Sequence, residues 1–83
     1  MTLLVVAARG SSWIEARRGS ATGQQFYAGT LAQGKDLRLQ GRRFWVRFGA
    51  LANLDLRLDG KPVQLVHTGT VNALFMRGGI RPG

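Results

Sequence analysis

Few side chains in this sequence could take part in acid–base, nucleophilic or metal chemistry. The chain has one histidine, His67, no cysteine and four carboxylates, which are Glu15, Asp36, Asp55 and Asp59. A hydrolase built on paired carboxylates needs two acids that converge on a cleft, and a lone histidine among scattered aspartates is no zinc signature. No glycine-rich phosphate-binding pattern is present. The sequence therefore predicts a protein that is not an enzyme, with no catalytic residue, metal or cofactor, and an exposed or capping role for His67.

The side chains best suited to hold a ligand are two tryptophans and the arginines near them. By strand alternation, Trp13 and Trp45 point away from the core residues of their own strands. The candidate binding surface consists of Trp13, Arg17, Arg42, Arg43, Trp45 and Arg47. Aromatic and guanidinium groups on a β-face can stack on sugars or bases and pair with phosphates. The alternative is that each tryptophan covers the core at a sheet edge, because large aromatic side chains usually bury most of their surface.

The charge of the chain restricts its partners. Twelve lysines and arginines stand against four acids, which gives a net charge of +8. This balance favours anionic partners such as nucleic acid, lipid head groups or acidic wall polymers. The arginines are scattered along the chain, however, and that distribution fits a solvated surface in an arginine-biased proteome equally well.

The elements that would position these residues are short apolar segments separated by turn signals, a spacing typical of antiparallel β-sandwiches and barrels. The clearest lies at 53–65, where leucines alternate with charged residues as far as Asp59. The pair Asp59-Gly60 favours a type I′ turn, because both central residues of that turn need positive φ. Strands are predicted at 2–8, 13–18, 25–31, 36–39, 44–48, 54–58, 63–65 and 70–76, with one helical turn near Leu51.

The fold class predicted from this pattern is all-β: a small antiparallel β-sandwich, or partly open barrel, of about seven to eight short strands. Residues 1–77 form a single β-domain, and residues 78–83 form a flexible C-terminal tail because they show no periodicity. Pro62 lacks a ladder donor, so its strand is expected either to begin as an edge or to pair through residues beyond 62. No apolar run approaches the length that spans a bilayer, so the chain as given is not expected to span a membrane.

Four segments, taken in order, resemble the C-terminal domain of RodZ-type proteins. They are Ser12–Ala16, Phe26–Gly34, Phe44–Gly49 and Leu54–Val63. The last two match an aromatic strand that ends in glycine and a strand that ends in a Gly-x-Pro-Val turn. Asp59 stands where the family often has asparagine, and Ala16 replaces a β-branched residue. The resemblance covers residues 3–77.

The resemblance implies a role as well as a fold. The resemblance implies a protein with a cytoplasmic helix-turn-helix domain, one membrane span and a β-domain outside the membrane. Proteins of this type link the actin-like MreB cytoskeleton to wall synthesis and cell shape. The chain is then expected on the extracytoplasmic side of the bacterial cell membrane, attached to it only through an upstream span outside this chain. There it would contact anionic cell-wall polymer or membrane-protein partners, without enzymatic activity.

The alternative function is a free-standing basic β-barrel that binds single-stranded nucleic acid. Its affinity would fall steeply with added salt, because bound phosphates release counterions. Both tryptophans would then serve as stacking surfaces. The family resemblance favours the first function and makes nucleic acid an unexpected partner for this domain.

Overall fold

The computed structural model describes residues 1–65 and 69–83, so His67 and its expected exposed or capping role lie outside the described residues. It contains nine strands and one short 3-10 helix: β1 (Thr2–Val6), β2 (Ser12–Arg18), β3 (Gln25–Leu31), β4 (Asp36–Gln40), β5 (Arg43–Phe48), η1 (Leu51–Asn53), β6 (Asp55–Leu58), β7 (Lys61–Val63), β8 (Val71–Met76) and β9 (Gly79–Pro82). Among the residues described, no helix has the length and apolar character needed to cross a membrane.

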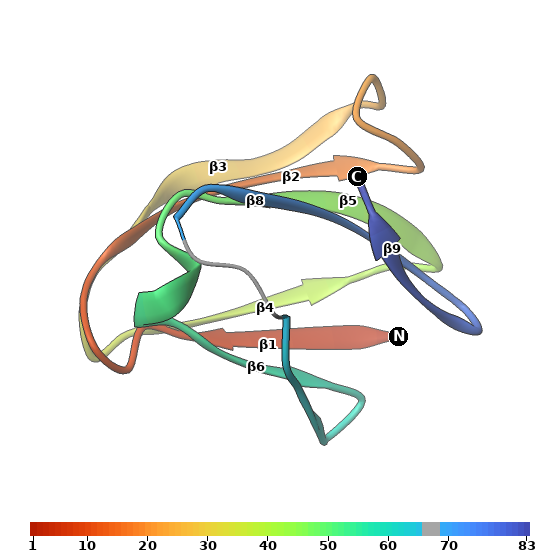
Figure 1. Cartoon of the computed structure of the whole chain (residues 1–83). Coiled ribbons are helices and arrows are strands. Elements are labelled where there is room, and N and C mark those ends of the chain that lie inside the picture. The colour runs from red at the N-terminus through yellow and green to blue at the C-terminus, as the bar shows by residue number, and fades with distance from the viewer. Residues whose placement is uncertain (66–68) are drawn as a thin grey trace.

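The strands form two antiparallel sheets that pack face to face (Figure 1). One sheet has four strands in the order β4-β1-β6-β7, and the other has five in the order β3-β2-β5-β8-β9. Each sheet keeps two free edges, so the layers do not close into a barrel. This confirms the predicted all-β sandwich, and the partly open barrel is not found.

Alternation along β2 and β5 builds the centre of the core. Ile14 and Ala16 of β2, and Phe44, Val46 and Phe48 of β5, have no exposed surface. They face each other across the register, with Ile14 opposite Phe48 and Ala16 opposite Val46. Because successive side chains of a strand point to opposite faces, the residues between them lie on the outer face of the five-stranded sheet.

The hairpin of β6 and β7 has the predicted turn. Asp59 and Gly60 both have positive φ, 51° and 83°. The Asp59 carboxylate also accepts a hydrogen bond of 2.8 Å from the backbone N–H of Thr2, which ties the turn to the start of β1. β7 lies at the sheet edge, one of the two arrangements expected from Pro62, although it begins at Lys61 and ends at Val63, earlier than the sequence indicated.

The C-terminal segment differs from its prediction as a flexible tail. Residues 79–82 form β9, which pairs with β8 from Met76 opposite Gly79 to Ala73 opposite Pro82. Gly78 and Gly79 have φ of 98° and 155°, a region that favours glycine and allows a tight reversal of the chain. The segment is too short to show alternation, so periodicity alone missed it.

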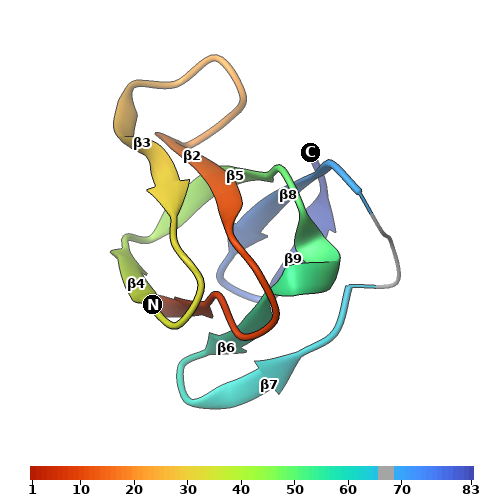
Figure 2. The ribbon, with the colours of Figure 1, turned by 90° about the vertical axis from the view of Figure 1, so that its left-hand side faces the viewer.

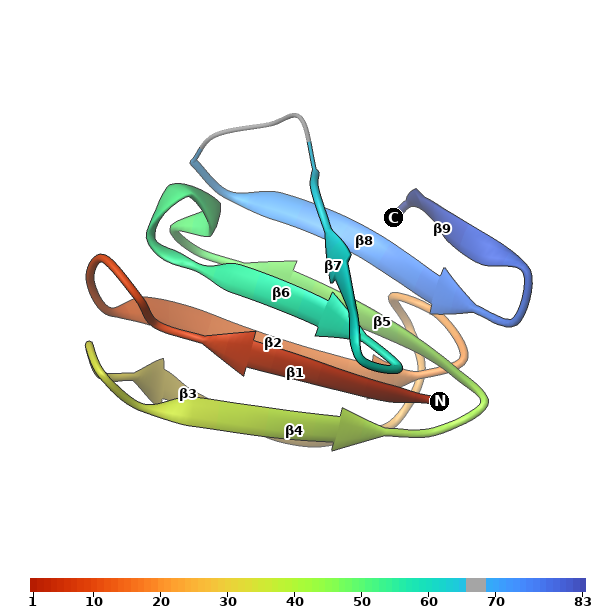
Figure 3. The ribbon, with the colours of Figure 1, turned by 90° about the horizontal axis from the view of Figure 1, so that it is seen from below.

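The free edges lie on two sides of the sandwich. Figure 2 shows β3 and β4 along one side and β7 and β9 along the other. Seen from below, the four-stranded sheet lies in front, with β4 at one border and β7 crossing β6 at the other (Figure 3). The predicted helical turn is present as η1, which connects β5 to β6.

Candidate functional site

Five of the six candidate binding residues come together on the outer face of the five-stranded sheet. Arg17 of β2 pairs with Trp45 of β5 in the register, and alternation places Trp13 on the same face of β2. Arg43 and Arg47 flank Trp45 on β5 and share its face. These five residues therefore point away from the core, as strand alternation predicted. We call the surface that they share the outer face.

Trp13 is exposed at one end of the outer face. Trp13 has 45% of its surface exposed, and it is the one large hydrophobic residue so exposed in the described part of the chain. Gly49 lies beside it, and a Cβ built on Gly49 would come within 3.1 Å of the Trp13 Cβ. Any side chain at Gly49 would crowd the Trp13 Cβ and backbone, so glycine allows the two strands to approach closely here.

The backbone under Trp13 is firmly held. The Gly49 N–H donates to the Trp13 carbonyl at 2.8 Å. The buried Ser12 hydroxyl donates to the same carbonyl at 3.1 Å and accepts from the Ala50 N–H at 3.0 Å. The indole is therefore presented from a fixed strand end, which lowers the entropy cost of holding a ligand against it.

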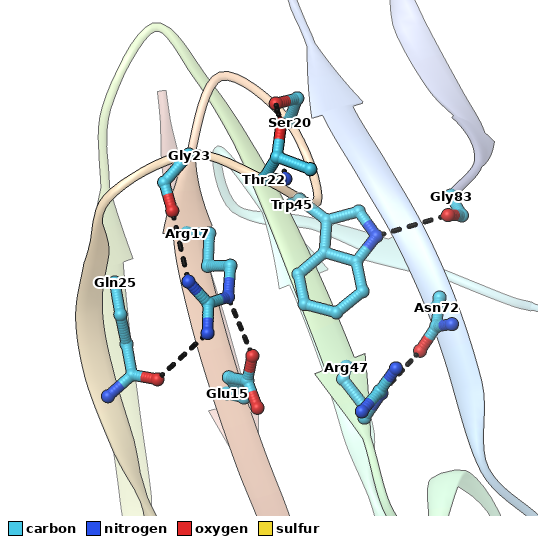
Figure 4. Close-up of polar contacts among 10 residues, drawn as sticks. All are labelled: Glu15, Arg17, Ser20, Thr22, Gly23, Gln25, Trp45, Arg47, Asn72 and Gly83. Atoms are coloured by element: carbon cyan, nitrogen blue, oxygen red, sulfur yellow. Dashed lines mark hydrogen bonds and ion pairs between the residues drawn. The ribbon is translucent and has the colours of Figure 1, made fainter.

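Trp45 lies on the outer face but is covered. Only 3% of its surface is exposed, and its indole N–H donates to the Gly83 carbonyl at 3.2 Å (Figure 4). The Arg47 guanidinium lies 5.3 Å from the ring centroid. A Cβ added to Gly83 would lie 2.6 Å from the indole nitrogen. The chain after β9 therefore lies against the nitrogen edge of the indole, and with 3% of its surface exposed Trp45 presents no free ring face to a stacked ligand.

The arginines of the outer face differ in how their charge is used. Arg17 forms an ion pair of 2.7 Å with Glu15 and also donates to the Gly23 carbonyl at 3.1 Å (Figure 4). Arg43 donates to the Gly19 carbonyl at 2.8 Å, and Arg47 to the Asn72 side chain at 3.0 Å. These acceptors are neutral, so the charges of Arg43 and Arg47 are not balanced by a carboxylate among the described residues.

The arginines on the outer face differ from the predicted set in two positions: Arg81 is present and Arg42 is absent. Arg81 pairs with Leu74, which in turn pairs with Trp45, so alternation places Arg81 on the outer face. The sequence predicts a flexible tail over residues 78–83, so it indicates no facing for Arg81. Arg42 precedes β5 and lies elsewhere, in a groove of about 630 Å³ that Leu58, Met76 and Arg77 also line.

The outer face combines one exposed indole with four arginines and a single carboxylate, Glu15. Such a surface can stack on a planar or sugar ring and pair with phosphate or carboxylate groups. Within residues 1–65 and 69–83, no cluster of side chains has the composition of a metal site. The geometry is therefore that of a cationic surface with one exposed indole on a small β-sandwich.

The fold and this surface define a class of small antiparallel β-sandwich domains with a cationic outer face. The profile of the RodZ C-terminal domain family matches residues 5–74, and the chain belongs to that family. This is the family that the sequence resemblance indicated, and it makes the chain a domain of the RodZ-like, cell-shape class. Neither the search of curated proteins nor that of solved structures found a match.

Proposed function

We propose that the chain is the extracytoplasmic, non-enzymatic interaction domain of a membrane-anchored, RodZ-like protein of the bacterial cell envelope. The support is its membership of the RodZ C-terminal domain family over residues 5–74. The cytoskeletal contact implied by the resemblance would belong to a cytoplasmic part outside this chain. Reading the native gene tests the architecture: a helix-turn-helix domain and one membrane span should be encoded upstream, and a different upstream domain would contradict it.

We further propose that the outer face contacts an anionic wall polymer. The observation that carries this is the exposed Trp13 on the same face as Arg43 and Arg47, whose charges no described carboxylate balances. A sugar or polyol unit can pack on the indole while a neighbouring phosphate pairs with a guanidinium group. The net charge of +8 attracts such a polymer from a distance.

The first test is a chemical-shift titration of the isotope-labelled domain with glycerol-phosphate teichoic acid, with uncharged glycan as the comparison. Shifts should concentrate on Trp13, Arg47 and the neighbouring outer-face amides, and they should weaken with added salt because the contact is ionic. Shifts spread evenly over both sheets would mean that only the net charge attracts the polymer.

Matched variants sharpen this test. Trp13→Ala removes the stacking surface, and Arg47→Gln removes a charge from the same face; each should weaken binding by about tenfold. Arg57→Gln removes the same charge from the four-stranded sheet, because Arg57 pairs with Leu4 of β1 there. It should change the affinity by about twofold or less, through net charge alone. Equal losses in Arg47→Gln and Arg57→Gln would contradict a site on the outer face.

A single-stranded oligonucleotide serves as a further arm of the titration. Two stacking tryptophans would have favoured nucleic acid, and the burial of Trp45 leaves Trp13 as the exposed one. We therefore expect the oligonucleotide to bind no more tightly than teichoic acid of equal charge. Tighter binding that Trp13→Ala abolishes would identify the domain as a nucleic-acid binder instead.

A further inference from the structure

The four free edges of the sandwich differ in how they are protected against pairing with another strand. A free edge presents every second backbone N–H and C=O to solvent, which makes it a template for an added strand. Proteins usually protect such edges with proline, charge or short length. In an antiparallel sheet the hydrogen bonds of one pair of residues fix which residues face the neighbour and which face outward.

Proline protects the two edges on one side. Gly83 donates to Asn72 across β9 and β8, so alternation turns Ile80 and Pro82 of β9 outward. In the β6–β7 hairpin, Lys61 closes the two-residue turn opposite Leu58, which turns Pro62 outward. Each edge is therefore short and has proline, which has no N–H to donate, at an outward position.

Charged side chains protect β4. The Ala7 N–H donates to the Lys35 carbonyl, so Leu37 and Leu39 face β1, and the residues between them face outward. The outward backbone groups of β4 therefore belong to Asp36, Arg38 and Gln40. A strand that paired with β4 would have to pack beside the exposed charges of Asp36 and Arg38. Charged residues commonly protect natural edge strands in this way.

β3 has neither form of protection. Because Gly49 donates to the Trp13 carbonyl, Trp13 faces β5 and the alternate residues of β2 face β3. The register, regular from Tyr27 to Leu31, then turns Ala28 and Thr30 outward. Both residues are exposed and uncharged. Outside the pairing with β2, no backbone hydrogen bond of residues 26–30 is made to any described part of the chain.

We propose that β3 is a docking edge for an extended acidic peptide segment of another protein, which adds as a sixth strand to the five-stranded sheet. The outward N–H and C=O groups of Ala28 and Thr30 would form the ladder, as in other cases of strand addition. Half-buried Phe26 and Tyr27 beside them offer apolar contact for alternate side chains of the peptide.

The charges around β3 select an acidic occupant. Arg18 is exposed, with its guanidinium 4.5 Å from the Phe26 ring centroid, and the exposed Lys35 lies on the turn that follows β3. Neither forms an ion pair with a described carboxylate. A second copy of the chain would bring another +8 of charge, and that repulsion disfavours self-pairing relative to an acidic strand.

The probe is a capped synthetic peptide that alternates glutamate and valine, added to the isotope-labelled chain. Hydrogen exchange of the Ala28 and Thr30 amides should slow by about tenfold or more at saturation, because these N–H groups become paired. The matched probe replaces every valine with proline, which keeps the charge but removes alternate donors, and it should not slow exchange there. Equal effects of the two peptides, or none, would overturn the proposal.

Two variants locate the contact on the chain. Ala28→Pro removes an outward N–H without touching the ladder with β2, and it should weaken peptide binding by about tenfold or more. Gln40→Pro makes the same change at an outward position of β4 and should leave the affinity unchanged. If Ala28→Pro fails to fold, the comparison of the two peptides on the unmodified chain still decides. Shifts of Ala28 and Thr30 that depend on the concentration of the chain alone would make a second copy the occupant and overturn the proposal.

Discussion

Trp13 and Trp45 show how two residues of one type, on one face of one sheet, acquire different roles. Trp13 lies opposite Thr30 and beside Gly49 in the neighbouring strands, and 45% of its surface is open to solvent. Trp45 lies in the middle of the sheet, where the end of β9 reaches its indole. The first is therefore available to a ligand, and the second contributes to stability by burying its ring on the outer face.

This difference predicts unequal stability effects of the two truncations. Trp45→Ala removes a buried ring and its hydrogen bond to Gly83, so it should lower the free energy of unfolding by about 3–5 kcal/mol. Trp13→Ala should cost about 1 kcal/mol or less, as surface substitutions usually do. Urea denaturation followed by circular dichroism measures both. Equal losses would show that the end of β9 does not cover Trp45.

At the scale of the element, β9 is the segment that most changes the outer face. It adds Arg81 to that face, covers Trp45, and leaves Pro82 at the free edge. None of this follows from its short sequence, because Gly79–Pro82 has neither alternation nor the β-branched residues typical of strands other than Ile80. Its position comes from the glycine turn that returns the chain along β8.

Amide hydrogen exchange distinguishes β9 from a flexible tail. The Gly83–Asn72 hydrogen bond fixes the alternation, so the Arg81 N–H faces β8 and the Ile80 N–H faces solvent. We expect Arg81 to exchange much more slowly than Ile80. In a flexible tail both amides would exchange at the rate of an unfolded chain, and that result would contradict the pairing of β9 with β8.

At the scale of the whole molecule, the burial of one small core has to offset the repulsion among the charges on the surface. A single cluster of apolar residues from both sheets forms that core, and a chain of 83 residues leaves little stability in excess. Only two ion pairs occur within the described residues. On the outer side of the four-stranded sheet, Leu4 of β1 pairs with Arg38 of β4 on one side and with Arg57 of β6 on the other. Two like charges are therefore close together there.

Added salt should therefore stabilise the fold. Raising sodium chloride from about 10 mM to about 150 mM shortens the screening length from about 30 Å to about 8 Å, which weakens repulsion among the unpaired arginines. We expect Tm to rise by a few degrees, because about 1 kcal/mol corresponds to about 4–8 °C in a domain of this size. The double variant Arg38→Gln, Arg57→Gln should respond less to salt. A Tm that falls with salt would show that attractive pairs dominate the surface.

The sequence by itself determined the local features of this protein. Alternation fixed which side chains of β2 and β5 face the core and which face outward, because a period of two is a property of each strand alone. Asp59-Gly60 fixed the hairpin turn through the positive φ of both residues. The family, and the tryptophan and arginine types of the candidate surface, were also predictable from residues in the linear chain.

Only the tertiary structure decided what lies beside each strand. The cover over Trp45, the arrival of Arg81 on the outer face, the separate position of Arg42 and the unprotected edge at β3 all depend on sheet order. Sheet order is set by contacts between residues far apart in the chain, such as those of β1 with β4 and β6. A repeating local pattern shows which way a side chain points, but it has no information about which distant strand will come to lie next to it.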